Sequence, residues 1–334
     1  MENNNPNHTC NIPVVVNVWL RQDILLKQFE VIRNVRPNII FFASDGGRNK
    51  DEHNQIIIIR KIAEKVDWNC IIYKIFEDNN LGMLPMLKRV LDFVFSKVDR
   101  CAYLEDDIIP SSSYFYFCSE LLEKYKEDER IIMINGMNHL EVYDKPNADY
   151  FFSNEGSIWG IAFWKRTYLR YCDKEYENDS YIRARIIEQG RVVKKTKFAK
   201  KITTNSFSQS YISGSEFNLG FIQLTQNQLI IIPTKNLISN LGNDKLATHA
   251  SEYRYIPKGI RRVFNMKTYE YGFPLKHPKY VIPDYYYSKQ VRKIMANGYP
   301  IVYFYRKIES ALRHLVYGDF RGLKKKIFKL IKSK

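Results

Sequence analysis

The 334-residue sequence lacks the signals of several protein classes. No apolar stretch approaches the roughly 20 residues that a membrane-spanning helix needs, and the first ten residues lack the basic and apolar regions of a signal peptide. The five cysteines form no Cys-x-x-Cys pair, and the six histidines do not cluster with them at metal-ligand spacing. We therefore expect a cytoplasmic protein with reduced cysteines and neither a zinc site nor a thiol nucleophile.

Two nucleotide-binding fingerprints are also missing. No Gly-x-Gly-x-x-Gly follows the first expected strand, and no phosphate-loop Gly-Lys-Ser/Thr occurs. The first half instead alternates β-branched runs with apolar residues at helical spacing. The expected strands are 12–20, 38–43, 70–76 and 101–104, and the expected helices are 24–32, 56–66, 83–97 and 114–126. This alternation is typical of an α/β fold with a mostly parallel sheet covered by helices on both faces.

The order is less regular beyond residue 130. Strands are expected at 131–136, 150–153 and 229–233, and the aromatic segment 158–164 is a loop or a strand. Residues 185–205 lack apolar runs and are rich in lysine, above all from Lys194 to Lys201, so we expect a mobile basic connection there. After residue 251 the chain is basic and tyrosine-rich without clear alternation of strands and helices.

An acidic triplet follows the fourth expected strand. Glu105, Asp106 and Asp107 come directly after residues 101–104, and a helix is expected soon after them. Most acidic triplets are solvated turns or helix starts, but this one lies at a strand-to-helix junction. In an open α/β sheet, ligands bind beyond the carboxyl ends of the strands, where carboxylates can hold a divalent cation that grips a diphosphate. The triplet therefore indicates a nucleotide-sugar enzyme.

The formal charge of +16 favours an anionic partner, which can be nucleic acid, a phosphate-bearing substrate or an acidic membrane surface. Residues 321–334 contain seven basic residues and no acidic ones. Their apolar residues fall at helical spacing, which suits a helix lying on anionic lipid. The alternative is a tail helix that packs its apolar stripe on the domain.

Several short segments together resemble bacterial glycosyltransferases of the GT-A fold, in the hemolytic-protein-like group related to N-acetylglucosaminyltransferase I. Each segment is weak alone, but they occur in the order that the family has. They are residues 14–21, 44–47, 80–82, 104–107, 134–138, 159–164, 233–242, 247–249 and 274–278. The resemblance implies a GT-A catalytic domain at 11–250, with a nucleotide-binding half (11–130) and an acceptor half (131–250), followed by a basic extension at 251–334 with an amphipathic tail.

The resemblance also implies donor-binding roles. Arg21 would contact the nucleotide, Asp45 would read the uracil edge, and segment 80–82 would add Asn80 and Gly82 to the donor site.

The acidic triplet is DXD-like in this comparison. Asp107 would bind Mn²⁺ or Mg²⁺, Asp106 would hold the ribose or the donor sugar, and Glu105 would hold a sugar hydroxyl. The ion would bridge Asp107 to both phosphates and stabilise the charge on the departing diphosphate.

The acceptor side rests on two weaker correspondences. Glu216 stands where the family has an aspartate in Trp-Asp-Tyr-Gln-Trp, so it is the candidate catalytic base, although both tryptophans are absent here. His249 would close the nucleotide pocket or contact the metal, and its alternative is a structural role. Trp159 and Trp164 could shape a sugar pocket or serve the core.

The sequence therefore predicts a metal-dependent glycosyltransferase of polysaccharide biosynthesis. It would move a sugar from a nucleotide diphosphate donor, UDP-linked, to a hydroxyl of a surface glycan or lipid-linked acceptor. Inversion is expected from the resemblance, and retention stays open. The protein would be peripheral on the inner face of the cell membrane, with no nucleic-acid partner expected. Two alternatives remain, a nucleic-acid-binding protein and a sugar-phosphate nucleotidyltransferase.

Overall fold

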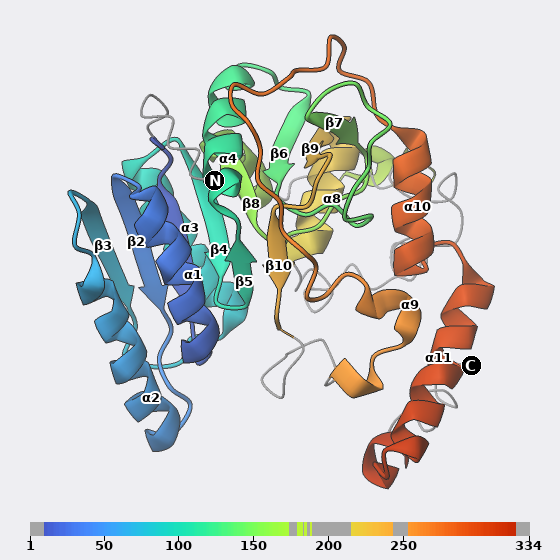
Figure 1. Ribbon diagram of the computed structural model, residues 1–334, viewed down its shortest axis with the longest axis horizontal. Coiled ribbons are helices and arrows are strands. Elements are labelled where there is room, and N and C mark those ends of the chain that lie inside the picture. Colours follow the sequence, from blue (N-terminus) through green and yellow to red (C-terminus); the bar gives the residue numbers. More distant parts are fainter. Residues whose placement is uncertain are drawn as a thin grey trace.

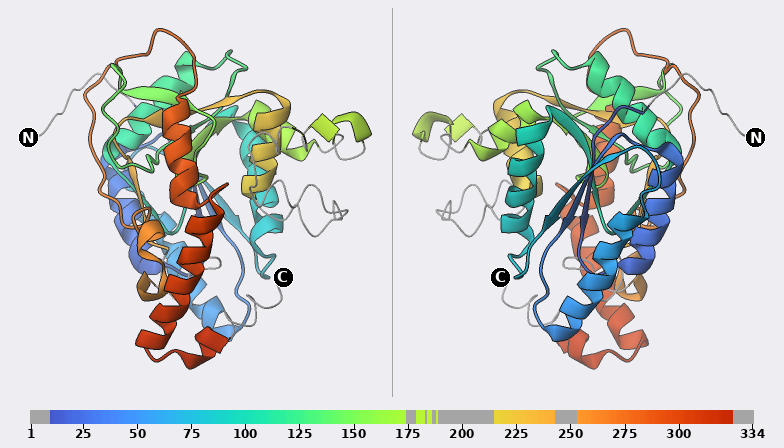
Figure 2. Two further views of the ribbon diagram at one scale, coloured as in Figure 1. Left: turned by 90° about the vertical axis from the view of Figure 1, so that its right-hand side faces the viewer. Right: turned by 90° about the vertical axis from the view of Figure 1, so that its left-hand side faces the viewer.

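The computed structural model describes residues 10–173, 179–182, 184–185, 188, 215–242 and 253–324. Within these ranges, one large sheet forms the middle layer and helices cover both of its faces (Figure 1, Figure 2). The expected α/β class with a mostly parallel sheet is confirmed.

The sheet has eight strands. Their order across the sheet is β3 (Ile71–Phe76), β2 (Ile39–Ser44), β1 (Val14–Val18), β4 (Arg100–Glu105), β8 (Ile161–Trp164), β6 (Ile131–Asn135), β9 (Leu229–Pro233) and β7 (Tyr150–Ser153). The first four strands are parallel, β8 is antiparallel to both of its neighbours, β6 and β9 are parallel, and β7 is antiparallel to β9. A separate antiparallel pair joins β5 (Ile108–Pro110) to β10 (Ile238–Asn240).

Helices pack on the two faces and form two apolar cores with the sheet. The first core lies under α1 (Gln22–Val35), α2 (Lys50–Arg60), the 3₁₀ turn η1 (Lys61–Lys65) and α4 (Ser112–Lys124). The second lies under α3 (Met83–Lys97), α5 (Lys165–Cys172), α8 (Ser215–Thr225) and α10 (Tyr285–Met295). The turn η3 (Tyr253–Tyr255), α9 (Lys258–Arg261) and α11 (Pro300–Val316) lie to one side of the sheet (Figure 1).

The local sequence explains the elements of the first half. Strand β1 is a continuous apolar run because it is buried on both faces: Val14 and Val16 face the first core and Val15 faces the second. Helix α1 buries a stripe of apolar residues at helical spacing. It ends at Arg36, whose left-handed backbone (φ 54°) lets its N–H donate to the carbonyl of Ile32.

The expected helix at 56–66 begins earlier in the structure and changes form before its end. Helix α2 starts at Lys50 because the side chain of Asn49 accepts the N–H of Glu52 at 3.0 Å and caps it. The chain then tightens into η1 after Arg60. The first turns of α2 are polar, so a prediction based on apolar residues at helical spacing placed the start of the helix too late.

The surroundings of the acidic triplet also differ from expectation. Glu105 is the last residue of β4, and Asp106 and Asp107 form a turn into the short strand β5 rather than leading directly to a helix. Strand β5 forms because β10, more than 120 residues later in the chain, pairs with it in the register Ile108↔Asn240. Because the two strands lie far apart in the chain, no local sequence pattern predicts their pairing.

The C-terminal part of the chain contains helices that were not expected. It also contributes to both cores: Val263 and Leu275 lie in the first, and Tyr287 and Val291 of α10 lie in the second. In the ranges given above, no helix has both the length and the hydropathy that crossing a bilayer requires.

Gln28 fixes the turn that carries the acidic residues. Its side chain is buried in α1 and donates to the carbonyl oxygens of Glu105 at 2.8 Å and Ile108 at 2.6 Å. One amide group thus holds both ends of the turn against the first helix.

Replacing Gln28 by methionine, which has a similar shape, should lower the free energy of unfolding by about 1–3 kcal/mol, because a buried and a partly buried carbonyl lose their donor. Urea unfolding measures this value. The control is Gln22→Met on the exposed start of α1, which should stay within about 0.5 kcal/mol of wild type. Equal stability of the two variants would contradict the proposed role of Gln28.

Candidate functional site

Four parallel strands bring their carboxyl ends to one edge of the sheet. The loops that follow β1, β2, β3 and β4 start at Trp19, Asp45, Glu77 and Asp106. Strand order reverses between β1 and β4, because β2 lies on one side of β1 and β4 on the other. Such a switch point leaves a crevice at the carboxyl edge of an open α/β sheet.

Asp106 joins the turn after β4 to the loop after β1. Its Oδ2 accepts the main-chain N–H groups of Trp19 at 2.9 Å and Arg21 at 3.4 Å. Its Oδ1 accepts the Arg21 guanidinium at 2.9 Å, and both side chains are largely buried. The structure thus brings two predicted donor-site residues into one charge-assisted pair at the switch point.

Asp107 lies in the same turn. Its Oδ2 is 3.9 Å from Nη1 of Arg21, and its side chain is 17% exposed. Its main-chain carbonyl accepts the N–H of Leu241 at 2.8 Å, just after β10. A Cβ on the next residue, Gly242, would lie 2.1 Å from Oδ2 of Asp107, so the glycine keeps open the space beside this carboxylate.

Asp45 organises the loops after β2 and β3. Its Oδ1 accepts the N–H groups of Gly46 and Leu81, both at 2.8 Å. Its Oδ2 accepts the N–H of Gly82 at 2.9 Å and the side-chain nitrogen of Asn80 at 3.2 Å. The three predicted residues Asp45, Asn80 and Gly82 therefore meet, although they come from two loops.

These bonds occupy the Asp45 carboxylate. An ionised carboxylate has about four lone-pair positions, and four donors already point at this one. A contact from Asp45 to a nucleobase therefore requires one of these bonds to be exchanged. Gly46 adds a steric constraint, since a Cβ there would lie 2.4 Å from the main chain of Asn79.

Arg60 reinforces the same two loops and was missed by sequence reasoning. Its guanidinium donates to the carbonyls of Ser44 at 3.1 Å and Glu77 at 2.6 Å, and lies 4.7 Å above the centre of the Phe76 ring. Burial lowers the pKa of Arg60 below its ordinary value. Arg60 is the last residue of an isoleucine-rich helix, and no local sequence pattern predicts that it binds the ends of two neighbouring strands.

Trp19 adds an aromatic surface to the site. The Arg48 guanidinium lies 4.3 Å from the centre of its ring. Its indole Nε1 is buried and has no hydrogen-bond partner among the residues described. A bound ligand with an acceptor atom could satisfy that donor.

Glu105 lies apart from the other two carboxylates of the triplet. Successive strand residues point to opposite faces, and Glu105 shares the face of Tyr103, which belongs to the second core. There it borders a narrow, mostly apolar pocket between α3, α5 and α8. The other lining residues are Leu87, Leu91, Tyr103, Met133, Ile158, Ile161, Phe163, Thr167, Tyr168, Tyr171 and Leu219.

Of the remaining predicted residues, some lie outside the described part of the structure, and the two tryptophans belong to or pack against the first core. Glu216 lies in the first turn of α8, and its side chain is outside the described part of the structure. His249, the lysine-rich segment 194–201 and residues 325–334 are also outside it. Trp164 is a core residue whose indole donates to the carbonyl of Leu122 at 3.1 Å. Trp159 is partly buried and packs against Phe264.

The described residues do not form a complete metal centre. No group of three His, Cys, Asp or Glu side chains in these ranges could hold a metal ion. A cation bound together with a diphosphate needs fewer protein ligands, because one or two carboxylates suffice when the phosphates supply the others. Asp107 fits that requirement through its carboxylate and the space left by Gly242.

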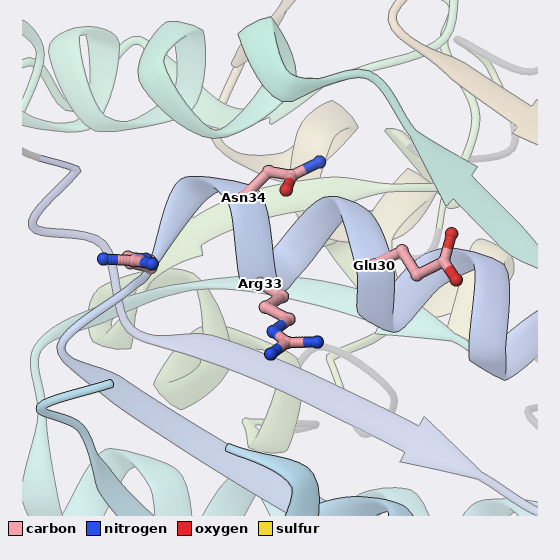
Figure 3. A pocket seen from close by; sticks show the side chains of 4 residues that line it. Glu30, Arg33 and Asn34 are labelled. Atoms are coloured by element: carbon pink, nitrogen blue, oxygen red, sulfur yellow. The ribbon is translucent and has the colours of Figure 1, made fainter. Parts of the chain in front are cut away.

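A surface hollow at the end of α1 is not part of this site. It is lined by Glu30, Arg33, Asn34 and Arg36. Because α1 runs back from the carboxyl edge, its C-terminal end lies at the opposite edge of the sheet. Figure 3 shows that the three labelled side chains point in different directions, and Arg33 is paired with Asp67.

The second half of the sheet contributes a buried histidine near the same edge. His139 follows β6, its main-chain N–H donates to the hydroxyl of Tyr287 at 3.1 Å, and its ring Nδ1 has no partner among the described residues. Burial, with the charge of Arg262, lowers the pKa of His139 from 6.5 to about 4.

Comparison with known proteins does not identify a relative: no family model matches the chain, and neither does any curated sequence.

The Asp45 contacts predict a large effect from a small substitution. Asp45→Asn should lower the free energy of unfolding by about 1–3 kcal/mol, because an amide nitrogen would face main-chain N–H donors. Urea unfolding measures it, with Asp99→Asn as a control at a carboxylate that is 85% exposed. If Asp45→Asn is as stable as the control, the carboxylate does not hold the two loops.

His139 predicts a pH dependence. Its folded pKa lies below its unfolded value, so the unfolded chain binds more protons between pH 4 and pH 6.5, and stability falls as pH falls through that window. The loss should reach about 3 kcal/mol. Free energies of unfolding measured across this range should depend less steeply on pH for His139→Met than for wild type. Identical slopes for wild type and His139→Met would refute this assignment.

Proposed function

We propose that the protein is a metal-dependent glycosyltransferase of the GT-A type, which transfers a sugar from a UDP-linked donor to a hydroxyl of a glycan or lipid-linked acceptor. The observation that carries this proposal is the cluster of Arg21, Asp106 and Asp107 at the switch point between β1 and β4. The position matches the crevice in which open α/β sheets bind nucleotides.

The cluster has the charges that a nucleotide diphosphate requires. Arg21 offers a guanidinium for the phosphates, and its main-chain N–H and side chain are held in place by Asp106. Asp107 offers the carboxylate that would hold Mn²⁺ or Mg²⁺, in the space that Gly242 leaves open. When bound, such an ion supplies charge stabilisation for the departing diphosphate.

The neighbouring loops give this cluster a rigid frame. Asp45 and Arg60 fix the loops after β2 and β3, and Gln28 fixes the turn after β4. Preorganised charges of this kind favour a developing negative charge without rearrangement of the protein. On the acceptor side, Glu216 remains the candidate base that would take the hydroxyl proton, with a place in α8 beside the second half of the sheet.

A thermal-shift experiment tests the donor site. Saturating UDP with Mn²⁺ should raise the melting temperature of the wild type, and a hundredfold excess over Kd corresponds to about 2.7 kcal/mol. Asp107→Asn should lose the metal-dependent part of the shift, and the exposed control Asp99→Asn should keep it. A panel of UDP, GDP and CDP shows whether the nucleotide is specific.

Three results would count against the proposal. The absence of a shift with every nucleotide, or an equal shift in Asp107→Asn, would contradict the donor site. Release of diphosphate from UTP and a sugar phosphate would favour a nucleotidyltransferase in the same crevice. A positive result for sugar transfer is the metal-dependent release of UDP from one UDP-sugar when an acceptor is added.

A further inference from the structure

Helix α11 carries its apolar residues on the outside. Seven large apolar or aromatic side chains follow one another at helical spacing and cover about one third of the helix circumference. All of them are exposed. They are Ile301, Phe304, Tyr305, Ile308, Leu312, Leu315 and Val316.

The inward face of α11 is polar and makes specific contacts. The hydroxyl of Ser310 donates to the carbonyl of Tyr255 at 3.0 Å, and the His314 ring stacks on the Tyr255 ring with 4.2 Å between centres. The Glu309 carboxylate accepts the N–H of Lys258 at 2.8 Å. These contacts fix the rotation of the helix, so its apolar stripe is held away from both cores.

An amphipathic helix of a globular protein normally turns its apolar stripe inward. Contiguous exposed apolar patches on a folded protein mark interaction surfaces. The described part of the chain places nothing over the stripe. Helices α10 and α11 lie one above the other on the same side of the molecule, which faces the viewer in the left panel of Figure 2.

The charge of the protein is concentrated in the same part of the chain. Residues 253–334 contain 20 of the 52 Lys and Arg residues but only four of the 36 Asp and Glu residues. This segment therefore carries the whole formal charge of +16, and residues 1–252 have 32 residues of each sign. Lys289 and Lys293 of α10 are exposed, as are Arg321 and Lys324 beyond α11.

We propose that α11 docks the protein on an anionic lipid bilayer, with its apolar stripe buried at the boundary between headgroups and acyl chains. Apolar side chains and basic residues together are the two features that hold an interfacial helix on anionic lipid. Exposed tyrosines such as Tyr305 suit this boundary because they have an apolar ring and a polar tip. With 17 residues that include charged side chains, α11 lies on the bilayer and does not cross it.

The positive charge favours an anionic bilayer over a second copy of the chain as the partner of this face. A second copy would bring two segments of charge +16 together, which opposes association. Residues 325–334, which follow in the sequence, contain five more lysines. The proposal does not depend on sugar transfer, because neither the crevice nor its carboxylates take part in it.

Sedimentation with vesicles tests the proposal on the 334-residue chain. The variant Ile308→Gln/Leu312→Gln removes two stripe residues that are 42% and 54% exposed. The matched control is Ile57→Gln/Ile58→Gln in α2, with 44% and 50% exposure. Both variants change exposed helical positions, so neither should alter folding, which circular dichroism can verify.

Wild type and the α2 control should bind vesicles of phosphatidylcholine with phosphatidylglycerol, and bind phosphatidylcholine alone much more weakly. The α11 variant should partition onto the anionic vesicles at least about tenfold more weakly. Wild-type binding by the α11 variant would overturn the proposal, as would an absence of vesicle binding by the wild type. A wild-type dimer that the α11 variant dissociates, without vesicle binding, would assign the face to a second copy instead.

Discussion

Hydrogen bonds from main-chain N–H groups to two buried carboxylates hold the carboxyl edge of the sheet together. Asp45 accepts such bonds from the loop after β3, and Asp106 accepts them from the loop after β1. Main-chain N–H groups beyond the ends of the strands lie outside the hydrogen-bond ladders of the sheet, so they need other acceptors, and here two side chains supply them. The arrangement of the loops at the switch point between β1 and β4, including the positions of Arg21 and Asp107, depends on these bonds.

The sequence was informative wherever local patterns decide the structure. Helix α3 has the predicted bounds, and β7 and β9 lie where β-branched or aromatic runs placed them. The candidate site was predictable in outline, because residues that follow parallel strands must meet at one edge. The contacts within the site were not predictable. Asp106 pairs with Arg21, which lies 85 positions earlier in the chain. Arg60 holds two loops by binding main-chain carbonyls, and every residue has such a carbonyl, so the sequence does not mark these partners.

The C-terminal region was harder to interpret for a physical reason. Helix α11 was not predicted, and the direction of its apolar face is set by contacts with Tyr255 of η3 and Lys258 of α9, which lie more than 50 residues earlier in the chain. The amphipathic segment was predicted at 321–334, whereas the structure exposes a row of apolar side chains on residues 300–316. In the two proposals taken together, the α/β body would bind the soluble donor and the positively charged flank would hold the protein at the membrane that carries the acceptor.

If the loops at the carboxyl edge form one ligand-binding site, a bound nucleotide should protect all of them together. Hydrogen–deuterium exchange with and without UDP and Mn²⁺ tests this expectation most directly. With UDP and Mn²⁺ we expect slower exchange in peptides covering residues 19–22, 45–49, 79–83, 106–108 and 240–242, and no change around Arg33 and Arg36 at the opposite edge. Protection confined to the opposite edge or to α11, or no protection anywhere, would contradict it.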